Sequence, residues 1–167
     1  QVDIYSLRGQ LIISLLAFQS GVSCTADLVA GGAWDSHSKN DQSQEPLFSG
    51  LTDSLSFLWE YAETLGLADR LFVVVGSEFS RTPFYNADNG KDHHPIGSYL
   101  LMANKPSWGN RVVGLTDSLQ NAYKINPLTL QRDDTNGIFI NPKHVHNEIR
   151  RYLGMDVNPG LSSFQFN

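Results

Sequence analysis

The chain has 167 residues, of which 41% are hydrophobic, and this length and composition are enough for one globular domain with a buried core. The formal net charge is −5, with acidic and basic residues interspersed, so the sequence does not predict a nucleic-acid-binding surface. The longest apolar run near the start, LIISLLAF, is far shorter than a membrane span. We therefore expect a single domain over residues 1–167, with no membrane-spanning helix and no nucleic-acid partner.

The first half of the chain carries two helix patterns with a strand candidate between them. Residues 5–21, YSLRGQLIISLLAFQSG, place apolar residues at helical spacing and end in a glycine. Residues 23–32, SCTADLVAGG, are a short strand candidate, and we expect its Cys24, the single cysteine of the chain, to be an inert core thiol. After a polar loop, residues 47–66 show the apolar pattern of an amphipathic helix.

The second half begins with the clearest strand pattern. Residues 70–76, RLFVVVG, are apolar on both faces, which is typical of a central strand in a covered sheet. SYLLMA predicts a further strand, whereas RVVGL and AYKINPLTLQ are weaker strand or hairpin candidates. NPKHVHNEIRRYLGM predicts a closing helix with Asn141 as its N-cap, Pro142 at its first position and Gly154 past its end.

This order of elements predicts an α/β fold, in which a mostly parallel sheet is covered by helices on both faces. We expect RLFVVVG to be a central strand, flanked by the helices around Leu51 and Ile149.

Polar clusters follow the two best strand patterns directly. Asp35 and His37 come just after SCTADLVAGG, and Glu78 and Arg81 come just after RLFVVVG. In open α/β sheets, functional groups gather outside the carboxyl ends of the strands, and parallel neighbours would bring both loops to one rim. The loop that leaves this rim adds a third cluster, Asp92, His93 and His94.

These residue types suit a metal ion. Carboxylate and imidazole together fit zinc, manganese or iron, whereas calcium prefers an all-oxygen set. Asp35 and His37 are two residues apart, so in an extended backbone they point the same way and can share one ion. Asp92 could be a ligand or the partner that orients one. The alternative is that Asp35 and Asp92 only shape turns, and that Arg81 only pairs with Glu78.

Other polar residues have simpler interpretations. His144 and His146 lie two apart in the closing helix, so they do not share a helical side, and we expect them on a partly exposed face. Ser77 and Thr82 flank the acidic and basic pair after RLFVVVG, and we expect their hydroxyls to bond to the backbone of their own loops.

Three ordered motifs carry a resemblance to a known group. AWDSH (residues 33–37), SEFSRT (residues 77–82) and GKDHH (residues 90–94) resemble motifs of an uncharacterised bacterial family of exported proteins, usually twin-arginine-dependent, in the alkaline phosphatase and sulfatase superfamily. The resemblance extends to RVVGLTD and the closing helix, so it covers nearly all of the chain. Ser80 departs from the glycine usual in the family, and Ala33 replaces another small residue. The resemblance implies an alkaline phosphatase-like fold and a periplasmic or secreted location.

Site roles follow from the resemblance position by position. It places Asp35, His37 and His93 at one metal site, with zinc or manganese as the expected ion and calcium as an alternative. Glu78 falls where relatives bind a second metal, although Phe79 stands in the place of a ligand histidine. Arg81 would bind a phosphate or sulfate oxyanion.

The implied activity is metal-dependent hydrolysis of phosphate or sulfate esters, in small molecules or polymers. Family members are typically longer, and the nucleophile and one metal-binding aspartate of the superfamily come from an N-terminal half that nothing here matches. We therefore expect the chain to be the C-terminal part of a larger domain, with the missing half as its partner. The alternatives are a non-catalytic exported binding or surface protein that keeps the fold, and a fragment that is inactive alone.

Overall fold

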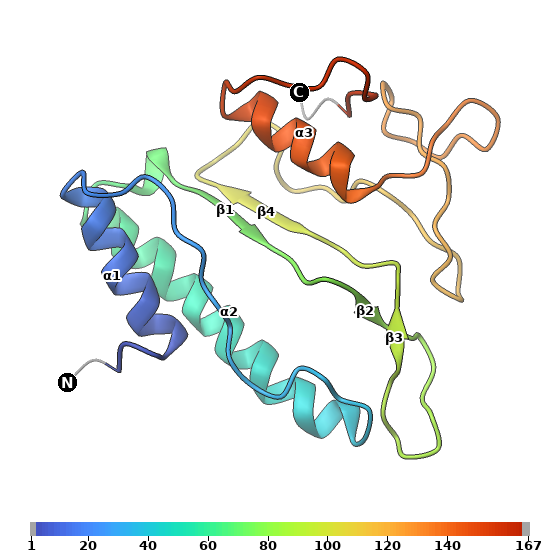
Figure 1. Ribbon diagram of the computed structural model, residues 1–167, viewed down its shortest axis with the longest axis horizontal. Helices are drawn as coiled ribbons and strands as arrows, with labels where there is room; N and C mark the ends of the chain where they lie inside the picture. Colours follow the sequence, from blue (N-terminus) through green and yellow to red (C-terminus); the bar gives the residue numbers. More distant parts are fainter. Residues whose placement is uncertain (1–2, 165–167) are drawn as a thin grey trace. The chain divides into compact units, whose positions relative to one another are not determined.

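The computed structural model describes residues 3–164 (Figure 1). The chain divides into two compact units, Gln1–Lys105 and Pro106–Asn167, called unit 1 and unit 2 below. This division does not test the expectation of a single domain over residues 1–167, which stays a prediction. The residues predicted for the candidate site all lie in unit 1: Asp35, His37, Glu78, Arg81, Asp92 and His93.

Two helices supply the buried core of unit 1. Helix α1 (Leu7–Gln19) begins at Ser6, whose hydroxyl accepts a hydrogen bond from the Gly9 amide, and helix α2 spans Asn40–Thr64. Their contact buries an apolar cluster, which contains Leu11, Leu15, Leu58, Ala62 and Leu67. Both helices predicted from apolar spacing are confirmed. Helix α2 begins at Asn40, well before the predicted start at residue 47, and its first turns are polar, so the apolar pattern did not reveal them. None of the helices in residues 3–164 is long and apolar enough to cross a membrane.

Within the described residues both sheets are two-stranded and antiparallel. Strand β1 (Phe72–Val75) pairs with β4 (Leu100–Ala103), and β2 (Ser80–Arg81) pairs with β3 (His93–His94). The expected mostly parallel sheet is therefore wrong for this part of the chain. The physical reason is the connection: no helix lies between β1 and β4, and the chain returns through the β2–β3 hairpin, which reverses its direction.

The predicted burial of β1 is also only half right. Val73 packs against the helical cluster of unit 1, whereas Val74, on the opposite face, is 43% exposed. The helix around Ile149, which was expected to flank this strand, belongs to unit 2. The mixed α/β character is thus established, and the alkaline phosphatase-like fold stays a prediction.

The strand expected at residues 23–32 does not form. These residues make neither helix nor strand. Cys24 is exposed, so the prediction that it is a core thiol is wrong. The Gln10 side chain takes the place of a neighbouring strand at Val29: it accepts a hydrogen bond from the Val29 amide over 3.0 Å and donates one to the Val29 carbonyl over 3.2 Å. The Gln10 side chain thus satisfies the backbone amide and carbonyl of Val29, which the sequence pattern predicted to pair within a sheet.

Unit 2 contains helix α3 (Pro142–Tyr152), which confirms the predicted closing helix and its cap. Asn141 caps it, and Gly154 beyond its end takes a left-handed conformation at φ 69°. His144 is buried, contrary to the expected partly exposed position, because its Nδ1 accepts a hydrogen bond from the Asn141 amide within the capping box. This burial lowers the pKa of His144. His146 is exposed.

The two weaker strand candidates of unit 2 form no strand of their own. Isolated antiparallel bridges join Thr116 to Ala122 and Ile125 to both Arg132 and Ile138.

Candidate metal centre

Two loops that are distant in sequence are joined at the candidate site. One precedes α2, and the other connects β2 to β3 (Figure 1). The Asn40 amide donates a hydrogen bond to the Asn89 carbonyl over 2.8 Å, and the Lys91 amide donates one to the Ser36 carbonyl over 3.1 Å. We call this pairing of residues 36–40 with residues 86–91 the loop clasp.

Gly90 and Asn86 fit the hairpin loop onto the backbone of His37. A β-carbon at Gly90 would lie 1.9 Å from the His37 carbonyl oxygen, so only glycine fits this contact. Asn86 Nδ2 donates to the same carbonyl oxygen over 2.9 Å and to Asp92 Oδ1 over 3.2 Å. The clasp therefore brings Asp92 next to His37.

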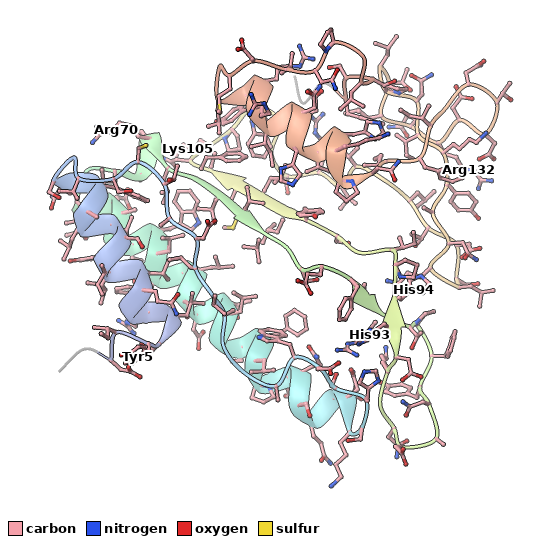
Figure 2. The ribbon with its side chains drawn as sticks, viewed as in Figure 1. Tyr5, Arg70, His93, His94, Lys105 and Arg132 are labelled. Carbon is pink, nitrogen blue, oxygen red and sulfur yellow. The ribbon has the colours of Figure 1, made fainter. Side chains whose placement is uncertain are left out.

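The β2–β3 hairpin presents its site residues on one face. Arg81 lies directly opposite His93 in the antiparallel register, and Phe79 precedes Arg81 by two residues, so all three side chains share that face. His93 and His94 leave β3 toward opposite faces (Figure 2). Of the two adjacent histidines, only His93 therefore belongs to the candidate site.

Asp35, His37 and His93 converge on one point. His37 Nε2 lies 3.1 Å from Asp35 Oδ1 and 3.2 Å from His93 Nε2, and His93 Nε2 lies 3.3 Å from Asp35 Oδ1. Two ligands of a tetrahedral zinc ion lie about 3.3 Å apart, because each bond is about 2.0–2.1 Å long. The three atoms form a nearly equilateral triangle with the spacing of ligands that share one ion. We call these residues the ligand triangle.

Asp92 contacts the triangle from behind. Its Oδ1 lies 2.9 Å from His37 Nδ1, and this contact, followed by the one with Asn86, lowers the pKa of Asp92. When Nδ1 carries the proton and donates it to the carboxylate, the lone pair of His37 Nε2 faces Asp35 and His93. The contact matches the orienting role expected for Asp92 as one of two alternatives. Its role as a direct ligand stays a prediction.

Arg81 anchors Asp35. Its Nη2 donates to Asp35 Oδ1 over 2.5 Å and to the Trp34 carbonyl over 3.2 Å, while Nη1 donates to the Lys91 carbonyl over 3.2 Å. The Arg81 side chain is 16% exposed, whereas that of Asp35 is 68% exposed. The guanidinium, followed by His93, holds the pKa of Asp35 below its ordinary value. The predicted contact of Arg81 with an oxyanion remains untested beside these bonds.

A protein-family model described as "Protein of unknown function (DUF1501)" matches residues 8–156. The chain belongs to the DUF1501 family. No curated protein and no solved structure matches the chain. The family match includes the whole ligand triangle and the loop clasp of this DUF1501 protein.

Glu78 stands apart from the ligand triangle. Its side chain is exposed and makes no hydrogen bond or ion pair with the described residues, and its predicted role at a second metal stays a prediction. Ser77 Oγ donates to the Phe79 carbonyl over 2.7 Å, and Thr82 Oγ1 donates to the Phe84 carbonyl over 2.9 Å. Both hydroxyls therefore bond to the backbone of their own loops, as predicted.

The roles of Phe79 and Asn86 were not predicted from the sequence. The Phe79 ring stacks on the His93 imidazole with 3.9 Å between ring centroids and 26° between planes. The alternation from Phe79 to Arg81 could have placed this ring on the same face as His93. For Asn86 no such signal exists, because asparagine in a polar loop usually only shapes a turn.

The ligand triangle is open to solvent on its free side. The side chains of Asp35, His37 and His93 are 68%, 47% and 52% exposed. Structural zinc sites are closed by four protein ligands, whereas catalytic sites have three and leave a position for water or substrate. Among the described residues, these three side chains could hold a metal ion, and the triangle has an open side.

Proposed function

We propose that this DUF1501 protein binds a divalent metal ion at Asp35, His37 and His93, and that the ion serves hydrolysis of phosphate or sulfate esters. The single observation that carries the proposal is the ligand triangle, with its edges of 3.1–3.3 Å and its open side. Three ligands, two from the loop before α2 and one from strand β3, with room left for a substrate oxygen, are typical of a catalytic rather than a structural ion.

Zinc or manganese is the ion that this set of ligands fits best. Two imidazole nitrogens and one carboxylate oxygen meet at the triangle, and imidazole is a preferred ligand of zinc, whereas magnesium and calcium prefer oxygen. The edges of the triangle agree with bonds of about 2.0–2.1 Å, which favours zinc over the larger calcium ion.

The residues around the ion have separate tasks in this proposal. The bound ion would supply Lewis-acid chemistry at an ester oxygen. Asp92 keeps the Nε2 lone pair of His37 directed into the triangle, and Arg81 keeps Asp35 in place. Arg81 has further N–H donors beyond its contacts with Asp35 and the two carbonyls, and we assign these to an oxyanion of the substrate.

We further propose that the nucleophile comes from the N-terminal half implied by the superfamily resemblance, and that the assembled protein works in the periplasm or outside the cell. The hydroxyls of Ser77 and Thr82 are engaged with backbone carbonyls, so neither is positioned to attack an ester at the triangle. The same observation favours a second candidate, a non-catalytic exported binding protein that keeps the ion.

Metal analysis of the purified chain tests the ion site. We expect about one equivalent of zinc or manganese in the native protein, since three ligands converge on one point, and a large loss in His37→Ala. His146→Ala, which removes an exposed histidine of α3, is the matched control and should keep the metal. Equal metal content in His37→Ala and the native protein would reject the site.

Turnover of aryl phosphates and aryl sulfates separates the two candidate functions. With zinc, manganese or calcium supplied, the chain alone should show little activity, whereas a chain extended upstream to include the superfamily's N-terminal half should be active. Robust turnover by the chain alone, abolished in Ser77→Ala or Thr82→Ala, would show that the nucleophile lies within it. A metal-loaded but inactive extended chain would favour the binding protein.

A further inference from the structure

The two histidines of the ligand triangle are supported in different ways. His37 has a hydrogen-bonding partner on each ring nitrogen, because Asp92 contacts Nδ1 while Nε2 faces the triangle. For His93, the contacts found among the described residues are those of Nε2, a stack on the Phe79 ring and a tilted contact with the His37 ring. A histidine ring turns in a broad torsional well about its last side-chain bond, so one nitrogen contact leaves the ring plane poorly defined.

The Phe79 ring supplies the missing restraint. It stacks on His93 with 3.9 Å between centroids and 26° between planes, and it is itself half-buried. The guanidinium carbon of Arg81 also lies 5.5 Å from the Phe79 centroid. The His93 ring in turn lies 4.9 Å from the His37 ring, tilted by 38°. The stack on Phe79 therefore restrains the plane of the His93 ring.

We propose that Phe79 is the positioning residue of His93: its ring fixes the imidazole plane so that Nε2 meets Asp35 Oδ1 and His37 Nε2 at the distances of one coordination sphere. This inference rests on the proposed metal site and extends it to a residue that touches no metal. A group that orients a ligand commonly accounts for about a tenfold to hundredfold difference in metal affinity. For His37 that group is a carboxylate, and for His93 it is an aromatic ring.

Substitutions at Phe79 separate the ring from its bulk. Phe79→Leu keeps an apolar side chain but removes the stacking face, whereas Phe79→Tyr keeps the face. Phe84→Leu is the matched control, because it makes the same change at a nearby residue of the β2–β3 loop that is 59% exposed. Zinc affinity is measured by competition with a chromophoric chelator, and cobalt(II) is titrated in parallel by its visible absorption spectrum.

We expect Phe79→Leu to lower zinc affinity about tenfold to hundredfold and to weaken the cobalt spectrum typical of a tetrahedral site, since His93 would no longer be held. Phe79→Tyr and Phe84→Leu should match the native protein. In NMR spectra of the metal-free protein, the ring protons of His93 should be shifted upfield by Phe79. That shift should vanish in Phe79→Leu and persist in Phe79→Tyr.

The outcomes distinguish this inference from the metal site itself. If the native protein and Phe79→Leu bind zinc equally well, Phe79 has no positioning role and the metal site stands. If the native protein binds neither zinc nor cobalt, the metal site fails and this inference fails with it. If Phe79→Leu loses its helical circular dichroism, Phe79→Met is measured in its place against the same criteria.

Discussion

Each residue of the ligand triangle is contacted by a different supporting side chain. Arg81 holds Asp35, Asp92 holds His37, and Phe79 stacks on His93. Ligand orientation by such neighbours is what separates a metal site from a chance meeting of polar side chains.

Asp92→Asn should weaken zinc binding about tenfold to hundredfold. The amide cannot accept the Nδ1–H bond with the charge of a carboxylate, so the ligating tautomer of His37 loses its support. Asp88→Asn is the control, because it makes the same chemical change in the same exposed loop without touching His37. Chelator competition with all three proteins measures the effect, and equal affinities for Asp92→Asn and the native chain would refute the orienting role.

The metal-free protein should lose stability in acid through Asp35. Arg81 lowers the pKa of this carboxyl in the folded state from its ordinary value of 3.8. A carboxyl with a lowered folded-state pKa contributes stability that is fully present above its ordinary pKa and is lost as the pH falls through the folded-state pKa. The free energy of unfolding, measured in urea, should therefore fall between about pH 5 and pH 2 more steeply for the native chain than for Asp35→Asn. Parallel curves would contradict this assignment.

At the scale of elements, the β2–β3 hairpin and the loop before α2 form the site together. The hairpin supplies Arg81 and His93, and the loop supplies Asp35 and His37. The loop clasp sets their register, and its closest approach is at Gly90.

Gly90→Ala should therefore damage the site although Gly90 is not one of the three candidate ligands. Its added β-carbon would overlap the His37 carbonyl, and relieving such overpacking typically costs about 1–3 kcal/mol. We expect lower stability in urea unfolding together with reduced zinc binding. Gly50→Ala is the matched control, because its added β-carbon would have no atom within 4 Å apart from its chain neighbours and the backbone of its own helix. Gly50 lies within α2, where alanine should stabilise the protein by about 0.5–1 kcal/mol. Unchanged zinc binding in Gly90→Ala would show that the clasp does not set the register.

Helices were more predictable from the sequence than strands. The three helices follow from apolar spacing and from caps such as Asn141, which are local signals. The apolar run of β1 indicates burial but not the direction of the neighbouring strand, so the antiparallel pairing with β4 could not be read from it. Likewise, the spacing of Asp35 and His37 predicted a shared ion, whereas the contacts of Asn86 and Phe79 depend on a hairpin that only the folded chain reveals.

At the scale of the whole molecule, metal binding should be visible as stability. The ligand triangle joins residues from two distant parts of the chain, and unfolding separates them, so the folded state binds the ion far better. Zinc at about one hundred times its dissociation constant should add about 2.7 kcal/mol to the free energy of unfolding. Thermal unfolding with and without zinc measures this gain. It should disappear in His37→Ala and persist in the control His146→Ala, and an equal gain in both variants would place the ion elsewhere.

X-ray absorption at the zinc edge of the loaded protein is the most direct test of the ligand triangle. From the ligand triangle we expect a first shell of nitrogen and oxygen at about 2.0 Å, with the outer-shell scattering of two imidazole rings. His93→Ala should remove one ring from that signal, and Asp35→Asn should leave both rings in place. A spectrum of the native protein without imidazole scattering, or one that His93→Ala leaves unchanged, would contradict the site.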